Sequence, residues 1–404
     1  MYIKYDYITF GLVLCLLLVG GVVIFSATQT ATGETGDLFY KQLLWISLGI
    51  TLLISISFIP IRSLHRTAYI LYGLSICGLI LVMFIGKAGQ GAERWLSFGF
   101  FRFQPSEFAK ITTILAVSKL LSDKYADVNH LKYFILTIGI ILLPAVLIVE
   151  QPDLGTSLVF LALTIPILFW AGLNWFYIFI ILSPLLVIIA SFNFWAFLFV
   201  MLIISFILFY SRRKPLIIAA VFILNIAVGI VTPYLWGHLR PYQQQRIVTF
   251  INPEKDPKGS GYQIIQSQVA IGSGGITGKG YLNGSQTHLR FLPAQHTDFI
   301  FSVIGEEFGF IGSALVLLIF LLLILRLIHL ASLVHDPFEN MILIGTVTII
   351  FFHVVINIGM TIGMAPVTGL PLPFISYGGS FLLTNMTMIG IVISIAKNKV
   401  GLSL

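Results

Sequence analysis

A single carboxylate, Asp298, stands where a long polar stretch of the sequence meets an apolar helix. The segment 288–310 reads HLRFLPAQHTDFIFSVIGEEFGF and becomes apolar at Phe299. An ionisable group at the edge of a membrane is costly, so it is a functional-site candidate by default. The chemistry open to it is acid–base catalysis, with His296 and Thr297 beside it. Helix capping is the structural alternative, because aspartate before a helix satisfies free backbone N–H groups.

Two more acids follow Asp298 in the same predicted helix. Glu306 and Glu307 lie about two turns deeper, where a purely structural helix would carry apolar residues. The outward-facing polar segments of the chain also converge on Asp298 in the topology derived below. Both observations favour a functional role for this region over helix capping alone.

A second polar cluster lies between residues 93 and 110, where Pro105 suits the first turn of a helix. Glu107 and Lys110 are three residues apart, on one face of that helix and just inside the membrane. They could neutralise each other as a salt bridge or line a functional cavity, and the two roles are compatible. The other candidates in this cluster are Arg94, Arg102, Gln104 and Ser106.

A third group of acids lies between two apolar segments, in EQPDLGT at 150–156. We predict that Asp153 caps the helix that follows, since this is the commonest role of aspartate at such a place. Glu150 and Asp153 both face outward in the predicted topology and could also meet a cation.

The long polar stretch 234–298 carries basic residues and many glycines. Its candidates to hold a phosphate group are Arg240, Arg246, Lys279 and Arg290. The run 271–280 invites a nucleotide-binding interpretation, but Ser273 stands where a P-loop has glycine, and Gly280 stands where it has Ser or Thr. We therefore expect no nucleotide here, and a close approach of the glycine backbone to helices or to a lipid head group.

Membrane helices must position all these residues. Of the 404 residues, 58% are hydrophobic and 10% are charged, and the mean hydropathy is +0.99. No soluble globular domain has such a composition, so the sequence predicts an all-α polytopic integral membrane protein with one domain over residues 1–404. Because a span needs about 20 apolar residues, the candidates are 8–27, 41–59, 68–86, 106–121, 133–149, 157–173, 176–192, 194–210, 215–233, 299–325, 341–363 and 375–396.

Basic residues flanking the spans predict the orientation. If the spans alternate, one side of the membrane receives Lys4, Arg62, Arg66, Lys124, Lys132, Arg212, Arg213, Lys214, Arg326, Lys397 and Lys399. The positive-inside rule makes that side the cytoplasm, with both termini there. The loops 28–40, 87–105, 150–156, 234–298 and 364–374 then face outward. Only Asn193 separates 176–192 from 194–210, so this pair could be one bent element, and we predict about 10–12 transmembrane helices.

Several further features fit a membrane protein. The net charge of +7 records topology and does not indicate nucleic acid. Cys15 and Cys77 both fall in apolar segments and are interpreted as small core residues. Dense turn signals predict that the extracytoplasmic loop 234–298 is ordered with short helices. Within it, the run from Tyr262 to Ile271 is amphipathic and is expected along the membrane surface.

Six stretches of the sequence together resemble the SEDS family (shape, elongation, division and sporulation). They are RWLSFGFFRFQPSEFAK at 94–110, QPDLGT at 151–156, GYQIIQSQVAIGSGG at 261–275, GKGYLNGSQ at 278–286, FLPAQHTDFIF at 291–301 and GLPLPFISYGGS at 369–380. The resemblance runs over most of the chain. The wording of GSQ and FLPAQHTDFIF is most similar to the elongation (RodA) branch, ahead of the division (FtsW) branch.

This resemblance implies a peptidoglycan glycosyltransferase that polymerises lipid II at the outer face of the bacterial cytoplasmic membrane, during cell elongation and shape maintenance. It places the family's essential acid on Asp298, and its cavity-lining acid and base on Glu107 and Lys110. It implies a class B penicillin-binding protein, which supplies transpeptidase activity, and other elongation-complex membrane proteins as partners. Family members usually have ten spans, so the pair near 176–214 departs from the pattern.

Glycosyl transfer from lipid II gives the candidate residues chemical roles. Asp298 would act as general base on the attacking sugar hydroxyl. Arg94, Arg102, Lys110 or a divalent cation (Mg²⁺ or Mn²⁺) could stabilise the leaving pyrophosphate, and no organic cofactor is expected. A lipid II flippase is one alternative, and it predicts polar residues continuing to the cytoplasmic face. A scaffold without activity is another, but it would have little use for acids inside the membrane.

Overall fold

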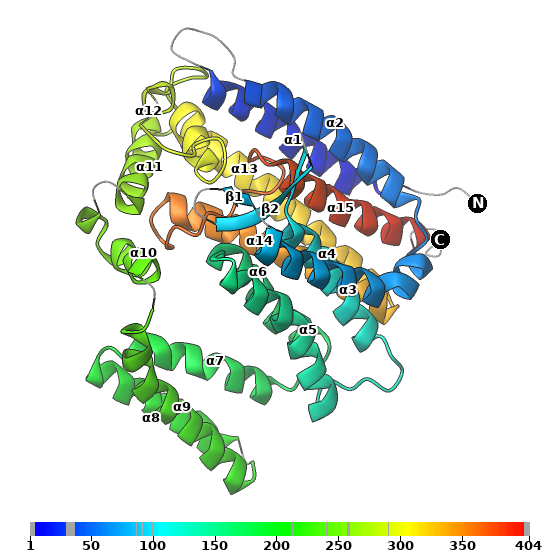
Figure 1. Ribbon diagram of the computed structural model, residues 1–404, viewed down its shortest axis with the longest axis vertical. Coiled ribbons are helices and arrows are strands. Elements are labelled where there is room, and N and C mark those ends of the chain that lie inside the picture. Colours follow the sequence, from blue (N-terminus) through cyan, green and yellow to red (C-terminus); the bar gives the residue numbers. More distant parts are fainter. Residues whose placement is uncertain are drawn as a thin grey trace.

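The computed structural model describes residues 5–29, 37–85, 87–89, 92–98, 101–211, 213–239, 241–256, 259–289 and 291–399. Helices dominate this part of the chain (Figure 1). The bundle helices are α1 (Tyr7–Thr28), α2 (Asp37–Ser57), α3 (Ile61–Ile85), α4 (Pro105–Leu121), α5 (Leu131–Glu150), α6 (Leu154–Trp170), α7 (Trp175–Ala190), α8 (Phe194–Tyr210), α9 (Pro215–Trp236), α13 (Ile300–Leu333), α14 (Pro337–Thr361) and α15 (Gly379–Lys399). The shorter helices are α10 (Pro241–Ile251), η1 (Pro253–Lys255), α11 (Ser260–Gly274) and α12 (Ser285–His288).

Each of the twelve predicted apolar segments contains one long helix. Within the described residues, eight helices are long and apolar enough to cross a membrane, namely α1, α2, α3, α5, α9, α13, α14 and α15. The apolar helices α6, α7 and α8 have only 16 or 17 residues, so they rise about 25 Å, slightly less than a typical hydrocarbon core. The polytopic helical fold is therefore confirmed, while the number of crossings between ten and twelve stays a prediction.

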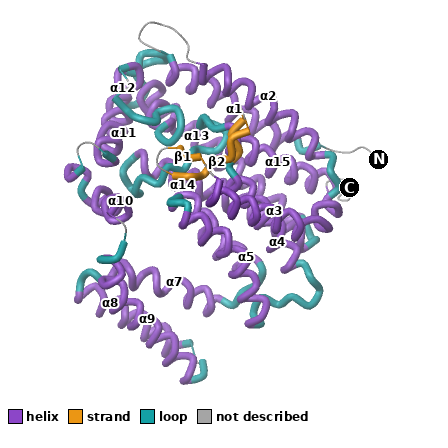
Figure 2. The backbone as a smooth tube through the Cα atoms, viewed as in Figure 1, coloured by secondary structure: helices purple, strands orange, loops and turns teal. Residues whose placement is uncertain are grey.

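A small antiparallel sheet corrects the purely helical prediction. Strands β1 (Lys87–Gly89), β2 (Ala92–Phe98) and β3 (Phe101–Phe103) pair in that order, in a segment predicted to be only an outward loop. Figure 2 shows the strands as a small patch among the helices. The sheet leads into Pro105, the first residue of α4 as predicted, so it fixes where the polar face of α4 begins.

The helices fall into two groups with separate cores. The larger core joins α1 to α6 with α13, α14 and α15, where α14 and α15 are the most buried spans. Helices α7, α8 and α9 pack on one another around Phe176, Val187 and Ile204, and they project from one end of the molecule (Figure 1). Glu107, Lys110 and Asp153 belong to this larger group, and Asp298 directly precedes its helix α13.

The loop 234–298 is ordered, as predicted, and contains α10, η1, α11 and α12. The amphipathic run from Tyr262 to Ile271 lies within α11, which buries Ile264, Ser267 and Ala270 against α13 and α14. Its predicted place along the membrane surface stays a prediction.

Helix α13 is broken where the glycine-rich loop meets it. Gly309 has a φ of 64° and a ψ of −157°, a conformation that strongly favours glycine. The backbone groups freed at the break pair with the loop through bonds of 2.9–3.1 Å, from Lys279 N to Glu306 O, Gly280 N to Glu307 O, Phe310 N to Gly275 O and Ile311 N to Ile276 O. The close approach to a helix expected of this glycine run is therefore confirmed.

Candidate active site

Asp298 lies one residue before the N-cap position of α13. The N-cap is Phe299, and no side-chain capping bond forms there. The Asp298 side chain is half-buried. Thr297 N and Phe299 N both donate to Ala294 O, at 3.1 and 3.3 Å, so Asp298 stands within a tight turn. Phe299 therefore occupies the N-cap position that the sequence offered to Asp298, and its side chain forms no capping bond.

The loop between α14 and α15 holds the backbone on both sides of Asp298. Asn357 Nδ2, in α14, donates to Asp298 O and to Leu370 O, at 2.8 Å each. Ser376 Oγ donates to Thr297 O at 2.6 Å, and Tyr377 N donates to His296 O at 2.9 Å. These bonds fix the direction in which the Asp298 side chain leaves the backbone.

Gly369 lies directly beside the Asp298 carboxylate. A Cβ added at Gly369 would lie 3.4 Å from Asp298 Oδ2. The φ of Gly369 is 74°, so its loop takes a turn that a larger residue would adopt only with strain. The absence of a side chain here leaves one side of the carboxylate open to a close approach by the loop backbone.

Glu107 and Lys110 form the predicted ion pair at the start of α4. Lys110 Nζ lies 2.8 Å from Glu107 Oε1, and the two side chains are only 1% and 6% exposed. Glu107 Oε2 is buried and accepts no hydrogen bond from the described residues. Ser106 is also buried, and Gln104 is half-buried just before the helix. A buried carboxylate with one oxygen unbonded retains the capacity to accept a further donor.

His353 joins this ion pair to the loop beside Asp298. Its Nε2 lies 3.3 Å from Lys110 Nζ, and its Nδ1 lies 3.1 Å from Pro371 O. The ring is fully buried in α14, one turn before Asn357. Through α14 and the loop at 369–377, the structure brings Asp298 and the Glu107–Lys110 pair to the same end of the bundle.

Neither His353 nor Asn357 is among the site residues predicted from the sequence. The available signal was a histidine and an asparagine four residues apart in an otherwise apolar helix, which places both on one face. Polar groups inside a membrane helix are costly and usually face a partner.

Asp153 caps α6, as predicted. Its Oδ1 accepts from Thr156 N at 3.2 Å, and its Oδ2 accepts from Thr156 Oγ1 at 2.9 Å. The neighbouring Gly155 packs against Thr368 O, in the loop that continues to Gly369. Asp153 therefore supports the wall of the site, and its possible contact with a cation stays a prediction.

Glu306 and Glu307 clamp the glycine-rich loop, so these two acids, which were counted in favour of a functional role for this region, have a structural role as well. The Glu306 side chain is fully buried. Its two oxygens accept five hydrogen bonds of 2.8–3.2 Å, from Lys279 Nζ, Ser285 Oγ, Gln286 N, Thr287 N and Thr287 Oγ1. Glu307 accepts from Ser26 Oγ of α1 and lies 3.8 Å from His288 Nε2. Burial, with a smaller contribution from Glu307, raises the pKa of the nearby Tyr281 phenol.

The basic residues proposed to bind phosphate lie in different environments, and some lie outside the described residues. Lys279 is engaged by Glu306, so its predicted contact with pyrophosphate stays a prediction while its role in the clamp is observed. Arg246 lies in α10 and is half-buried. Arg240 and Arg290 lie outside the described residues, as do the side chains of Arg94 and Arg102 in β2 and β3.

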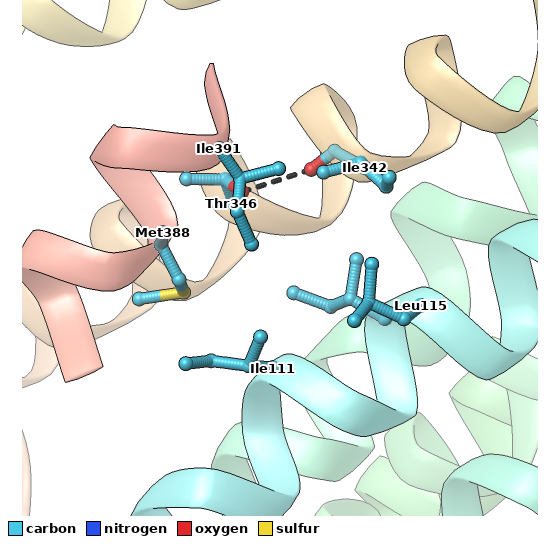
Figure 3. Close-up of a pocket in the computed structure, with 7 residues that line it drawn as sticks. Ile111, Leu115, Ile342, Thr346, Met388 and Ile391 are labelled. Atoms are coloured by element: carbon cyan, nitrogen blue, oxygen red, sulfur yellow. Dashed lines mark hydrogen bonds between the residues drawn. The ribbon is translucent and has the colours of Figure 1, made fainter. Parts of the chain in front are cut away.

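Toward the other end of α4 the buried polar residues are the uncharged Thr112, Thr113 and Ser118, and no buried charged side chain follows Lys110 in this described helix. Figure 3 shows Ile111, Leu115 and Ile342 facing Met388 and Ile391 across a narrow gap of about 10 Å³. The hydroxyl of Thr346, also at this gap, donates to Ile342 O at 2.9 Å. A gap of this size holds about one water molecule at most. A hollow of about 490 Å³ lies at the opposite end of the bundle, between Arg62, Ser122 and Asp336, apart from the acids described above.

The chain is similar to known proteins over nearly its whole length. The family model of the cell cycle proteins FtsW, RodA and SpoVE matches residues 7–197 and 179–400. The peptidoglycan glycosyltransferase MrdB of Escherichia coli is 36% identical over 393 residues, covering 97% of this chain and 93% of the relative. The peptidoglycan glycosyltransferase RodA of Treponema pallidum is 35% identical over 421 residues, with 97% of each chain covered. A chain of a solved peptidoglycan synthase complex, described as coordinating polymerisation and crosslinking, is similar with a TM-score of 0.76 and 30% identity, covering 98% of this chain and 99% of that one.

Proposed function

Because the chain belongs to the SEDS family of FtsW, RodA and SpoVE and is a multi-pass membrane peptidoglycan glycosyltransferase, we propose that it polymerises lipid II. The reaction takes place at the outer face of the cytoplasmic membrane, with Asp298 as general base. The proposal rests mainly on two contacts made by helix α14. Its Asn357 holds the backbone of Asp298, and its His353 contacts Lys110. One helix therefore supports both halves of the proposed site.

The proposed reaction forms a glycosidic bond between two lipid-linked sugars. A sugar hydroxyl of one substrate attacks the anomeric carbon of the other, and the bond from that carbon to the pyrophosphate oxygen breaks. Undecaprenyl pyrophosphate leaves, and the proton of the hydroxyl passes to the Asp298 carboxylate. A hydroxyl is a weak nucleophile near neutral pH, and a positioned base contributes roughly 10²–10⁴-fold to such a step. The half-buried position of Asp298 suits this role, because the carboxylate is held yet not sealed off.

The buried pair on α4 would help to handle the negative charge of the substrate. Lys110 supplies a fixed positive charge at the same end of the bundle, and positive charge placed in advance stabilises a leaving pyrophosphate. Arg94, Arg102 and Arg246 remain candidates for the same task. Among the described residues, no group of three or more His, Cys, Asp or Glu side chains is arranged to hold a metal ion. We therefore derive no step through a protein-bound cation, and a divalent cation arriving with the pyrophosphate stays a proposal.

We place the reaction on the extracytoplasmic side and in cell elongation. The orientation rests on the positive-inside rule. The elongation role rests on the similarity to MrdB and RodA over nearly the whole chain. The solved synthase complex supports a transpeptidase partner of the class B penicillin-binding protein type, together with other membrane proteins of elongation.

A flippase receives less support from the described residues. It would need a polar route across the bundle. Beyond Lys110, the buried polar residues of α4 are the uncharged Thr112, Thr113 and Ser118, and the gap beside this helix is lined mainly by apolar side chains. The site residues instead gather at one end. This arrangement suits an enzyme that acts on a substrate already present at that face.

Reconstitution with labelled lipid II tests the proposed function. We expect the purified full-length protein in liposomes to convert lipid II into glycan strands, and addition of a class B penicillin-binding protein to raise the rate. Parallel samples with Mg²⁺, with Mn²⁺ and with a chelator would show whether a cation takes part. Transfer of lipid II between leaflets without glycan formation under all these conditions would contradict the proposal in favour of a flippase.

A further inference from the structure

We propose that His353 is a positioning residue for glycosyl transfer, acting as a neutral imidazole that orients Lys110 and ties it to the loop beside Asp298. The inference rests on the proposed function, because it assumes that Lys110 serves the reaction. His353 is not among the residues that the family resemblance implies. None of its hydrogen bonds given above is to Asp298 or Glu107.

The hydrogen-bond partners of His353 assign its protonation state. Pro371 O can only accept, so Nδ1 of His353, 3.1 Å away, must carry a proton. The Lys110 ammonium can only donate, so Nε2, 3.3 Å away, must present its lone pair. A ring with a proton on Nδ1 alone is neutral. The same ring nitrogens could not serve both partners if the imidazole were doubly protonated.

Lys110 is held from three sides by groups that neutralise or orient its charge. Glu107 Oε1 lies 2.8 Å from Nζ, His353 Nε2 lies 3.3 Å from it, and the Phe381 ring centroid lies 5.2 Å from it. The Lys110 side chain is only 1% exposed. The lysine side chain has four carbons and several rotatable bonds, so without such partners it would sample many rotamers. His353 is the one of the three that also contacts the loop.

The contact with the loop couples the two halves of the site. His353 binds Pro371 O, while Asn357, one turn later on α14, binds Leu370 O and Asp298 O. Two successive loop carbonyls are thus held by two successive turns of one helix. A shift of the His353 ring would move Lys110 and the loop together, which is the behaviour expected of a residue that sets the geometry without touching the substrate.

Two substitutions separate the two contacts of the ring. In His353→Gln the amide oxygen can reach the position of Nε2 and accept from Lys110. In His353→Asn the shorter amide can donate from the position of Nδ1 to Pro371 O, but it cannot reach Lys110. We expect His353→Gln to retain most of the polymerisation rate. We expect His353→Asn to lower kcat about tenfold to a hundredfold, the size of one hydrogen bond to a charged group, with a smaller change in KM.

A double-mutant comparison identifies Lys110 as the partner. If His353 acts through Lys110, then His353→Asn should cause little further loss in a Lys110→Gln background. Equal rates for wild type and His353→Asn would overturn the proposal, as would a full additional loss in the double variant. These outcomes leave the proposed function standing as long as the wild-type protein makes glycan strands.

A measurement on the unmodified chain keeps the inference testable if the variants fail to fold. Nitrogen-15 NMR of the full-length protein labelled at its eight histidines reports the tautomer of each ring. We expect one signal set from a neutral ring with the proton on Nδ1 that stays unchanged between pH 6 and pH 8. If all eight rings titrate in this range, or none shows that tautomer, the proposal is wrong.

Discussion

Two Lys–Glu ion pairs in this protein have the same N–O distance, but their carboxylates accept different numbers of hydrogen bonds. Lys110 Nζ to Glu107 Oε1 and Lys279 Nζ to Glu306 Oε1 are both 2.8 Å. Both oxygens of Glu306 are bonded, by five donors in all, whereas Glu107 Oε2 accepts no bond from the described residues. The distance alone therefore does not distinguish a clamp from a site. The bonding of the paired carboxylate does separate these two pairs, because Glu306 is saturated whereas Glu107 can still accept a donor. Glu307 of the clamp shares the unbonded oxygen, so this difference applies to the two Lys–Glu pairs and not to every acid.

The largest expected effect on stability comes from breaking the clamp. In Glu306→Gln the amide nitrogen cannot accept the bonds now made to one of the two oxygens, and Lys279 loses its counter-charge. We expect the free energy of unfolding to fall by about 3–5 kcal/mol, as when one partner of a buried pair is removed. Chemical unfolding in detergent measures this change, with Glu254→Gln, an exposed glutamate of η1, as control. A stability equal to wild type would show that the five bonds do not hold the loop.

The second prediction compares neutral versions of both pairs. We expect the double variant Glu107→Gln with Lys110→Met to keep its stability within about 1 kcal/mol, because replacing both buried partners removes the uncompensated charge. Its polymerisation rate should fall about a hundredfold or more, since the fixed positive charge is gone.

The double variant Lys279→Met with Glu306→Gln should show the reverse pattern. It should unfold more easily, because either Gln286 N or Thr287 N loses its acceptor when one oxygen of residue 306 becomes an amide nitrogen, and its activity should follow the folded fraction. Rates normalised to folded protein, with unfolding curves from the same preparations, make the comparison. Identical behaviour of the two double variants would erase the distinction between clamp and site.

Much of this arrangement could be predicted from sequence, and the pattern of successes has a physical cause. The helices, the cap at Asp153 and the Glu107–Lys110 pair depend on residues within four positions of each other, so periodicity and spacing reveal them. The clamp was not predicted, because Glu306 meets Gln286 and Thr287 about twenty residues away. Local sequence shows only an acid in an apolar helix, which a site and a clamp produce equally.

The contacts that His353 and Asn357 of α14 make with the site could not be predicted from the sequence for the same reason. Lys110 and His353 are 243 positions apart, and no local pattern links them. The small sheet β1–β3 was also missed, because its strands have only three to seven residues. Strands this short give too few alternations to reveal a period of two.

A third prediction concerns the open side of the carboxylate. Gly369→Ala should cost about 1–2 kcal/mol in stability because alanine is strained at a φ of 74°. Its Cβ would lie 3.4 Å from Asp298 Oδ2, an ordinary contact, so we expect a raised KM with a smaller change in kcat. Gly172→Ala serves as control, since its φ is 85° and nothing lies within 4 Å of an added Cβ. An equal KM in both variants would separate Gly369 from the site.

The smallest expected effect lies beside the clamp. Tyr281 Oη donates to Val22 O at 3.4 Å, a long bond on a partly exposed side chain. Tyr281→Phe should therefore change the free energy of unfolding by less than about 0.5 kcal/mol and leave polymerisation unchanged. Unfolding curves and initial rates measure both. A large loss of activity would extend the site beyond the clamp and blur the contrast drawn between the two pairs.

The central claim is that the Asp298 carboxylate takes the proton of the attacking hydroxyl, and its direct test is the initial rate of lipid II polymerisation by Asp298→Asn. Asp127→Asn, the same change at an exposed loop carboxylate, is the matched control. We expect Asp298→Asn to fold like wild type and to lose about 10²–10⁴-fold in rate, while the control keeps the wild-type rate. A wild-type rate in purified Asp298→Asn protein would contradict the account.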